Sequence, residues 1–444
     1  MNNSRLIIVF VMSIIAIILM IARFKIHAFL SLLVVGIFFG LGIGMHPIEV
    51  ANIIASGFGG TMQSIGIVIV CGVIIGEVLE VTGGAQKIAN YILKLIGEKR
   101  AVLASSLTGS FVSIPVFCDS GFIILNPVIK GISSIAQIPY APLVVGLMSG
   151  LLLTHSFVPP TPGPVAASAI YGADIGKVML YGMMVAIPVA IIISIWANSK
   201  YIRGKFPQVA ELDAIDVAYE EEFKSVVAYA PSTFKSFLPI IIPIIFIILS
   251  SFFGKIDGNV LQQLISFLGT PWIALLIGVF ISFSLSTKIN QTVTSGWVTN
   301  AISGGSEVLL ITAAAGGFAG VLKSTEIGNV LAEGILGLGL PSLLIPYFMA
   351  MLINIATGSA TVALTTVPAL LAPILNTLGL SPEIAVLATA AGSMSFCHTN
   401  SSYFWAVSKL AKFDLNTSYQ TITVTSVLMG AFSMVIIFAL SIFV

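Results

Sequence analysis

Long apolar runs without a charged side chain divide this chain. Residues 26–48, 50–76, 178–199, 258–287, 384–408 and 415–444 contain no Asp, Glu, Lys or Arg. A bilayer core of about 30 Å needs roughly 20 residues of helix at about 1.5 Å per residue, so each run can cross it. The apolar run Leu6–Ile21 is followed at once by the next apolar segment and lacks a small-residue cleavage site, so we interpret it as a retained membrane helix.

The composition agrees with a membrane protein. Charged residues make up 8% of the 444 residues and hydrophobic residues 57%, which excludes a soluble enzyme and a disordered chain. The net charge of +1 gives no basic surface for nucleic acid. Three cysteines in apolar sequence predict neither a disulfide framework nor a metal site, and we expect no cofactor.

The hydrophilic stretch 199–235 divides the chain near its middle, and the flanking halves share features at a constant offset. Residues 59–60 and 304–305 are both Gly-Gly, and His155 corresponds to His398. We therefore predict a first repeat over residues 1–198, a linker over 199–235 and a second repeat over 236–444.

The distribution of basic residues predicts how the repeats are oriented. If each half has five crossings plus a hairpin, and both termini lie outside, only four of the 19 basic residues fall outside: Arg5, Lys177, Lys255 and Lys323. Cytoplasmic loops favour Lys and Arg, so this topology places the linker inside. An odd number of crossings per half makes the repeats inverted, which is typical of secondary transporters. The predicted fold is all-α and integral to the membrane, each repeat having about five transmembrane helices, a re-entrant hairpin and a broken helix.

Polar, Gly or Pro clusters interrupt the apolar sequence at residues 113–121, 155–164, 357–361 and 397–402. Broken backbone in a bilayer costs several kcal/mol per unpaired group unless protein, water or a ligand satisfies it. A helix that starts at a break offers free N–H groups and a partial positive charge. No Lys or Arg lies within the four breaks, so helix dipoles and neutral hydroxyl and amide groups would hold an anion. These features predict a site for a carboxylate carried on hydroxylated carbons.

Three titratable side chains in these breaks are candidates for binding a proton or the substrate. Asp119 lies far from any predicted loop end, and because burial disfavours a charged carboxylate, it is the candidate for proton coupling. His155 and His398 occupy equivalent breaks and could donate to a substrate oxygen. The alternative is that Asp119 is a carboxylate paired within a hairpin tip for structure and that each histidine is a packed, hydrogen-bonded residue.

Other classes of membrane protein fit less well. The P-loop, His-Glu-x-x-His and nucleophile-elbow motifs are absent, which argues against an enzyme. The predicted sites are closed and lie at mid-depth, which argues against a channel.

At these breaks the sequence resembles the gluconate permease family of bacterial proton symporters, within the wider ion-transporter superfamily. The resemblance rests on residues 155–164 (HSFVPPTPGP), 173–176 (ADIG), 358–363 (GSATVA) and 392–405. It covers essentially the whole chain. It implies uptake of gluconate, a related sugar acid or a small hydroxy acid with protons. It also implies re-entrant hairpins, a homodimer, an elevator-like movement and a place in the bacterial inner membrane.

The chain departs from the family pattern at Thr161, where many members have His, and at Ser401, where many have an acidic residue. Glycerate, another sugar acid or D-serine therefore stays open as the substrate, and a sodium-coupled carboxylate carrier is the nearest alternative. We predict Asp119 as the proton-coupling residue. The predicted substrate-binding residues are Ser120, His155, Thr161, Gly163, Ser359, Thr361, His398, Thr399 and Asn400. The expected partners are a small anionic hydroxy-carboxylate and membrane lipids.

Overall fold

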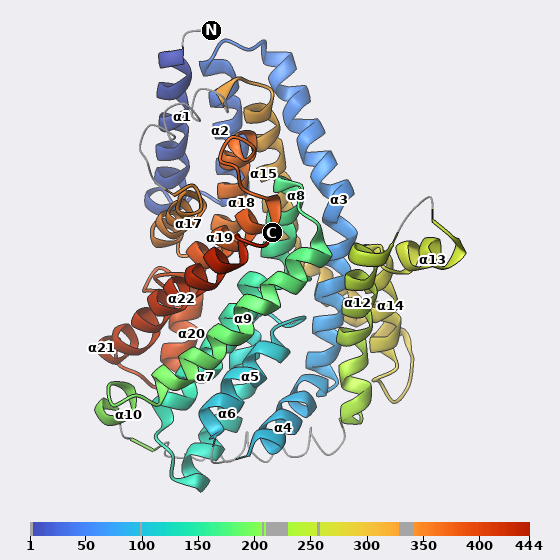
Figure 1. The fold of residues 1–444 in the computed structure, drawn as a ribbon, viewed down its shortest axis with the longest axis vertical. Coiled ribbons are helices and arrows are strands. Elements are labelled where there is room, and N and C mark those ends of the chain that lie inside the picture. The colour runs from blue at the N-terminus through green and yellow to red at the C-terminus, as the bar shows by residue number, and fades with distance from the viewer. Residues whose placement is uncertain (1–2, 98–99, 207, 210–229, 255–257, 328–340) are drawn as a thin grey trace.

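The computed structural model describes residues 3–97, 100–206, 208–209, 230–254, 258–327 and 341–444. Every regular element within these residues is a helix, which confirms the all-α prediction (Figure 1). Six described helical segments are long and apolar enough to span a membrane, or seven if one bent pair is a single span. Most of the predicted linker, residues 207 and 210–229, lies outside the described residues.

The first half is built from helices of unequal length. Two helices precede a long third helix, an amphipathic helix, two helices joined by a turn, a helix interrupted at a Pro-rich segment and a final long helix. Their bounds are α1 (Asn3–Ile18), α2 (Ala28–Gly42), α3 (Pro47–Val81), α4 (Gly84–Ile96), α5 (Ala101–Val112), α6 (Cys118–Ala136), α7 (Tyr140–Phe157), α8 (Pro162–Tyr171) and α9 (Ile175–Ala197). A single turn, α10 (Ile202–Lys205), follows.

The second half contains a similar series of helices. Its described bounds are α12 (Thr233–Phe253), α13 (Val260–Leu268), α14 (Pro271–Phe283), α15 (Trp297–Lys323), α17 (Leu344–Thr357), α18 (Ala360–Leu371), α19 (Pro382–Met394), α20 (Ser402–Leu410), α21 (Leu415–Ser418) and α22 (Val424–Leu440). As in the first half, a long helix (α15) precedes a pair joined by a turn (α17 and α18) and a helix broken before its second segment (α19 and α20).

Prolines mark several helix boundaries. Pro47, Pro162, Pro271 and Pro382 occupy the first turn of α3, α8, α14 and α19. Proline suits this position because the first N–H groups of a helix have no partner within it. The missing N–H group also explains where α7 ends. The Pro-rich sequence after Phe157 cannot donate the hydrogen bonds that would continue the helix.

The long helices α3 and α15 pack backbone to backbone. A Cβ atom on Gly57 would lie 2.5 Å from the carbonyl oxygen of Gly316, and one on Gly316 would lie 1.9 Å from Oγ1 of Thr61. Small residues permit such close approach, which is a common way for membrane helices to associate. α2 contacts both of these helices, α14 packs against α3, and α8 and α18 contact the pair as well.

Gly57→Ala is expected to lower the melting temperature of the purified protein, because the new methyl group meets the backbone of α15. Overpacking of this kind typically costs about 1–3 kcal/mol. Gly59→Ala, on the same helix, is the control, since nothing in the described part of the chain lies within 4 Å of its Cβ position and alanine favours helix. Thermal unfolding in detergent measures both variants. Equal melting temperatures for the two would contradict the close contact.

The helix pair α5 and α6 is packed tightly into the first half. A Cβ on Gly150 of α7 would lie 1.8 Å from the carbonyl oxygen of Ser106 on α5. The Ser106 hydroxyl donates to the carbonyl of Ala190 on α9, at 3.1 Å. The turn between α5 and α6 contacts α3, where a Cβ on Gly76 would lie 2.2 Å from the carbonyl oxygen of Pro115. These contacts fix the start of α6, which lines the site described next.

Candidate functional site

A cavity of about 120 Å³ lies where the helix interruptions of the two halves meet. Its walls come from α6, α7, α17, α18, α19 and α20, and from the breaks between them. Polar side chains, backbone and a few apolar groups share the lining. The lining residues are Cys118, Asp119, Leu152, His155, Asn354, Gly358, Ser359, Ala360, Thr361, Ser393, Met394, Cys397, Ser401, Ser402 and Tyr403.

Three helices begin at this cavity. α6 starts at Cys118, α18 at Ala360 and α20 at Ser402, and all three residues line the cavity. Ser359 caps α18 by accepting from the backbone N–H of Val362 at 3.2 Å. The capping residues of α6 and α20 make no such side-chain hydrogen bond. No N-cap side chain occupies the first-turn N–H groups of these two helices, so the partial positive charge at their starts suits an anion.

Two titratable side chains in the cavity have buried atoms without a hydrogen-bond partner in the described part of the chain. These atoms are Oδ1 of Asp119 and Nδ1 of His155. The His155 ring lies beside Phe117, with 5.9 Å between the ring centroids. Buried polar atoms are nearly always paired, so an unpaired carboxyl oxygen and ring nitrogen in one cavity indicate a place for a ligand or a proton.

The break between α19 and α20 is tied to the end of α17. Nε2 of His398 lies 3.0 Å from the carbonyl oxygen of Ile355, and the amide of Asn400 donates to the same oxygen at 3.2 Å. Gly358 ends α17 with φ +74°, a conformation that suits glycine. A Cβ at this position would lie 2.1 Å from the carbonyl oxygen of Asn400. The tip of the α17–α18 pair thus fits closely against the break.

α22 and the residues just before it hydrogen-bond to the backbone of the same break. Its Ser426 hydroxyl accepts from the backbone N–H of Cys397 at 2.8 Å, and the Thr423 hydroxyl, just before α22, donates to the Cys397 carbonyl at 2.6 Å. Asn354 of α17 donates to the Ser395 carbonyl at 3.0 Å. Side chains thereby satisfy backbone groups that the broken helix leaves unpaired, as a bilayer requires.

The structure brings together four of the ten residues that the sequence nominated. Asp119, His155, Ser359 and Thr361 all line the cavity. Of the other six, Asn400 and His398 contact Ile355, and the Thr399 hydroxyl pairs with that of Tyr419 at 3.1 Å. The remaining three, Ser120, Thr161 and Gly163, are not among the lining residues.

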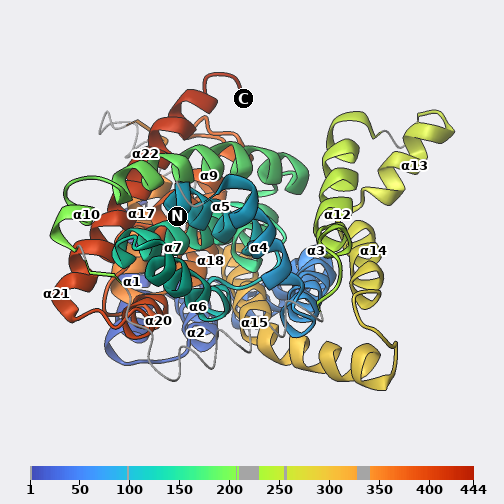
Figure 2. The same ribbon diagram turned by 90° about the horizontal axis from the view of Figure 1, so that it is seen from below.

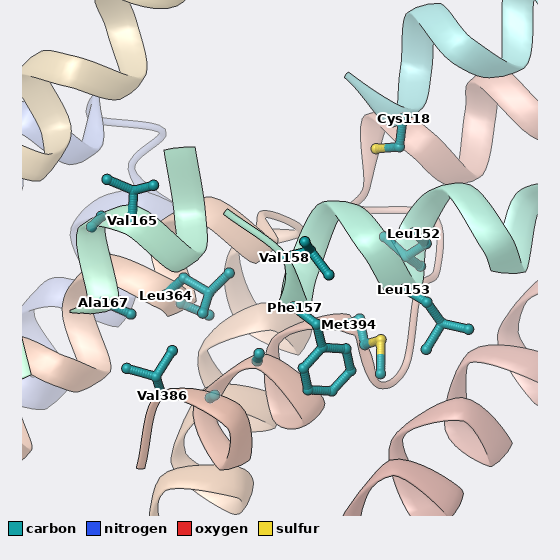
Figure 3. Close-up of a cluster of buried hydrophobic side chains, with 14 of the residues drawn as sticks. Cys118, Leu152, Leu153, Phe157, Val158, Val165, Ala167, Leu364, Val386 and Met394 are labelled. Carbon is teal, nitrogen blue, oxygen red and sulfur yellow. The ribbon is translucent and has the colours of Figure 1, made fainter. Parts of the chain in front are cut away.

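Thr161 ends the break between α7 and α8, and Gly163 lies in the first turn of α8; neither lines the cavity. The Thr161 hydroxyl donates to the Val158 carbonyl at 2.6 Å, and a Cβ on Gly163 would lie 2.7 Å from the side chain of Leu364 on α18. Figure 3 shows apolar side chains from α6, α7, α8, α18 and α19 gathered around this break. The break therefore contributes to packing between the two halves, and His155, in the last turn of α7 just before it, lines the cavity.

Several lining residues were not nominated from the sequence. Asn354, Ser393 and Tyr403 lie within helices, outside the four predicted breaks. Asn354 carried the clearest missed signal, since it is an amide in the otherwise apolar run Met349–Ala356. Neither lysine nor arginine is found among the lining residues. No group of three His, Cys, Asp or Glu side chains suited to a metal ion occurs in the described residues.

Comparisons with known proteins agree with this architecture. The model of the GntP permease family matches residues 5–443. The high-affinity gluconate transporter of Escherichia coli is 33% identical over 88% of this chain and 89% of its own length. A gluconate permease of Pseudomonas aeruginosa is 30% identical over 97% of this chain and 96% of its own.

A solved structure shares the fold. The YdaH transporter of Alcanivorax borkumensis superposes with a TM-score of 0.63 over 88% of this chain and 87% of its own, at 16% sequence identity. The relatives are permeases and transporters, which confirms the prediction that the chain is not an enzyme. The chain therefore belongs to the GntP family of permeases and is a multi-pass membrane transporter of the gluconate and sugar-acid permease family.

Proposed function

We propose that this protein takes up gluconate, a related sugar acid or a small hydroxy acid together with protons. The observation that carries the proposal is the cavity in which the uncapped starts of α6 and α20 meet the unpaired atoms of Asp119 and His155. Helix N-termini attract a carboxylate, and the neutral polar lining matches hydroxylated carbons. The names of the two gluconate relatives agree with such a substrate.

In this proposal the substrate carboxylate accepts from backbone N–H groups at the starts of α6 and α20. Ser359, Thr361 and Asn354 face the hydroxylated carbons, and His155 donates to a substrate oxygen. The other predicted site residues would then act indirectly, because they shape the segments that hold the lining residues. They are Ser120, Thr161, Gly163, His398, Thr399 and Asn400. Asp119 binds the coupled proton, which reduces the negative charge in the cavity as the anion enters.

The proposed movement follows from the order of the helices. The two halves would be inverted repeats, residues 1–198 and 236–444, joined by a cytoplasmic linker over 199–235, with both termini outside. α3 and α15 would stay fixed while the cavity helices move across the inner membrane as an elevator. Two chains would form the working homodimer.

Purified protein in vesicles tests this function. With a panel of gluconate, glycerate, other sugar acids and D-serine, a pH gradient should drive accumulation of at least one hydroxy acid. Uptake that requires sodium at a fixed pH gradient would instead favour a sodium-coupled carrier, whose ion the neutral oxygens of Asn354 and Ser359 could bind. Counterflow exchange should occur with the carrier, and its absence would contradict the proposal.

A further inference from the structure

A second and larger cavity, of about 770 Å³, lies away from the substrate cavity, between the start of α9 and the helices α12, α13 and α14. In both ribbon views these three helices lie on one side of the molecule (Figures 1 and 2). Hydroxyl, amide and carboxylate groups contribute much of the lining. The polar side chains are Asp174, Ser250, Ser251, Gln263, Ser266 and Thr270.

Asp174 is the single charged side chain among the described residues that line this cavity. It caps α9, where its Oδ1 accepts from the backbone N–H of Lys177 at 2.9 Å and from the Ser251 hydroxyl at 2.7 Å. The side chain is nevertheless exposed, so a carboxylate faces the cavity. A group with a positive charge and hydrogen-bond donors complements this lining, and an anionic group does not.

α13 supplies an apolar surface beside the polar cavity. Val260, Leu261, Leu264 and Phe267 are 82%, 64%, 50% and 59% exposed, and α13 buries none of its side chains. Gln263 and Ser266, on the same helix, line the cavity. A helix with one apolar and one polar side, at the end of a membrane-spanning helix, is suited to the boundary between headgroups and acyl chains.

We propose that this cavity binds the headgroup of an aminophospholipid, phosphatidylethanolamine, while its acyl chains lie against the exposed apolar side chains of α13. The ammonium group pairs with Asp174, and its N–H groups also reach the hydroxyl oxygens of Ser250 and Ser266. The Gln263 amide donates one N–H to the Gly258 carbonyl at 2.9 Å, and its second N–H would donate to the phosphate. Charge complementarity favours this lipid over an anionic phospholipid such as phosphatidylglycerol. The ammonium group of phosphatidylethanolamine offsets the charge of its own phosphate beside the Asp174 carboxylate, whereas the headgroup of phosphatidylglycerol has no cation.

The test compares lipid retention by purified wild-type protein, Asp174→Asn and Asp414→Asn. Asparagine caps a helix as well as aspartate and can still accept from Ser251, so Asp174→Asn removes the charge and keeps the fold. Asp414 is the matched control, because it caps α21 by accepting from the Thr417 N–H at 2.9 Å and does not line this cavity. Each protein is equilibrated with equimolar phosphatidylethanolamine and phosphatidylglycerol, and bound lipid is counted by native mass spectrometry.

Wild-type protein and Asp414→Asn should retain phosphatidylethanolamine in preference to phosphatidylglycerol, and Asp174→Asn should lower that ratio by about threefold, as expected for one exposed ion pair. Leu264→Ser should lower retention of both lipids. Equal retention of the two lipids by wild type, or an unchanged ratio in Asp174→Asn, would overturn the proposal. So would cross-linking that places a second copy of the chain on α13. The measurement needs no substrate, so its outcome is independent of the proposed transport function.

Discussion

Asp119→Asn is expected to abolish accumulation of substrate against its gradient while leaving exchange of bound substrate intact. Oδ1 of Asp119 is buried in the cavity and has no hydrogen-bond partner among the described residues, and an amide of the same shape cannot take up and release a proton. A difference of one pH unit coupled to one proton supports about tenfold accumulation. The wild type should approach that ratio in vesicles, and the variant should stop at equal concentrations inside and outside.

Counterflow separates loss of coupling from loss of folding. Vesicles loaded with unlabelled substrate should exchange it for labelled substrate with either wild type or Asp119→Asn, because the proton stays bound in exchange. Asp414→Asn, which changes a capping carboxylate outside the cavity, should accumulate substrate as the wild type does. Full accumulation by Asp119→Asn would show that the coupled proton binds elsewhere.

Gly358→Ala is expected to reduce uptake by at least about tenfold. The new Cβ would lie 2.1 Å from the Asn400 carbonyl oxygen, and the residue has φ +74°. A left-handed conformation costs a non-glycine residue about 1–3 kcal/mol, and the clash must also push the tip of the α17–α18 pair away from the break. Because both segments line the cavity, the substrate groups would lose their alignment.

Gly379→Ala is the matched control for this substitution. Gly379 has φ +63°, so alanine there meets the same kind of backbone strain, but no atom of the described residues lies within 4 Å of its Cβ position. Initial uptake rates, normalised to folded protein by size-exclusion chromatography, should fall strongly in Gly358→Ala and only slightly in Gly379→Ala. Equal losses would show that strain alone, and not the contact with Asn400, limits transport.

The interruptions of the helices could be predicted from the sequence because Pro, Gly and clustered polar residues have local effects. α5 ends at Val112 and α6 starts at Cys118, within the first predicted break. α17 ends at Thr357 and α18 starts at Ala360, within the third. Asp119 and His155 were identified for a similar local reason, since a polar group in an apolar run is conspicuous.

The pairing of distant elements could not be predicted in the same way. Which face of a helix meets a cavity depends on packing across the chain, so Ser120 was nominated and Asn354, some 230 residues away from it, was not. The sequence likewise did not show that α3 runs unbroken through Gly57, Gly59 and Gly60, where Gly57 contacts α15. Helix length and the meeting of the two halves are therefore properties of tertiary packing.

A structure determined with a saturating sugar acid would test the central claim most directly. The account predicts one ligand in the cavity among α6, α18 and α20, with its carboxylate within hydrogen-bond distance of backbone N–H groups at the starts of α6 and α20 and a hydroxyl near Asn354 or Ser359. A ligand bound outside this cavity, or one whose carboxylate points away from both helix starts, would contradict it.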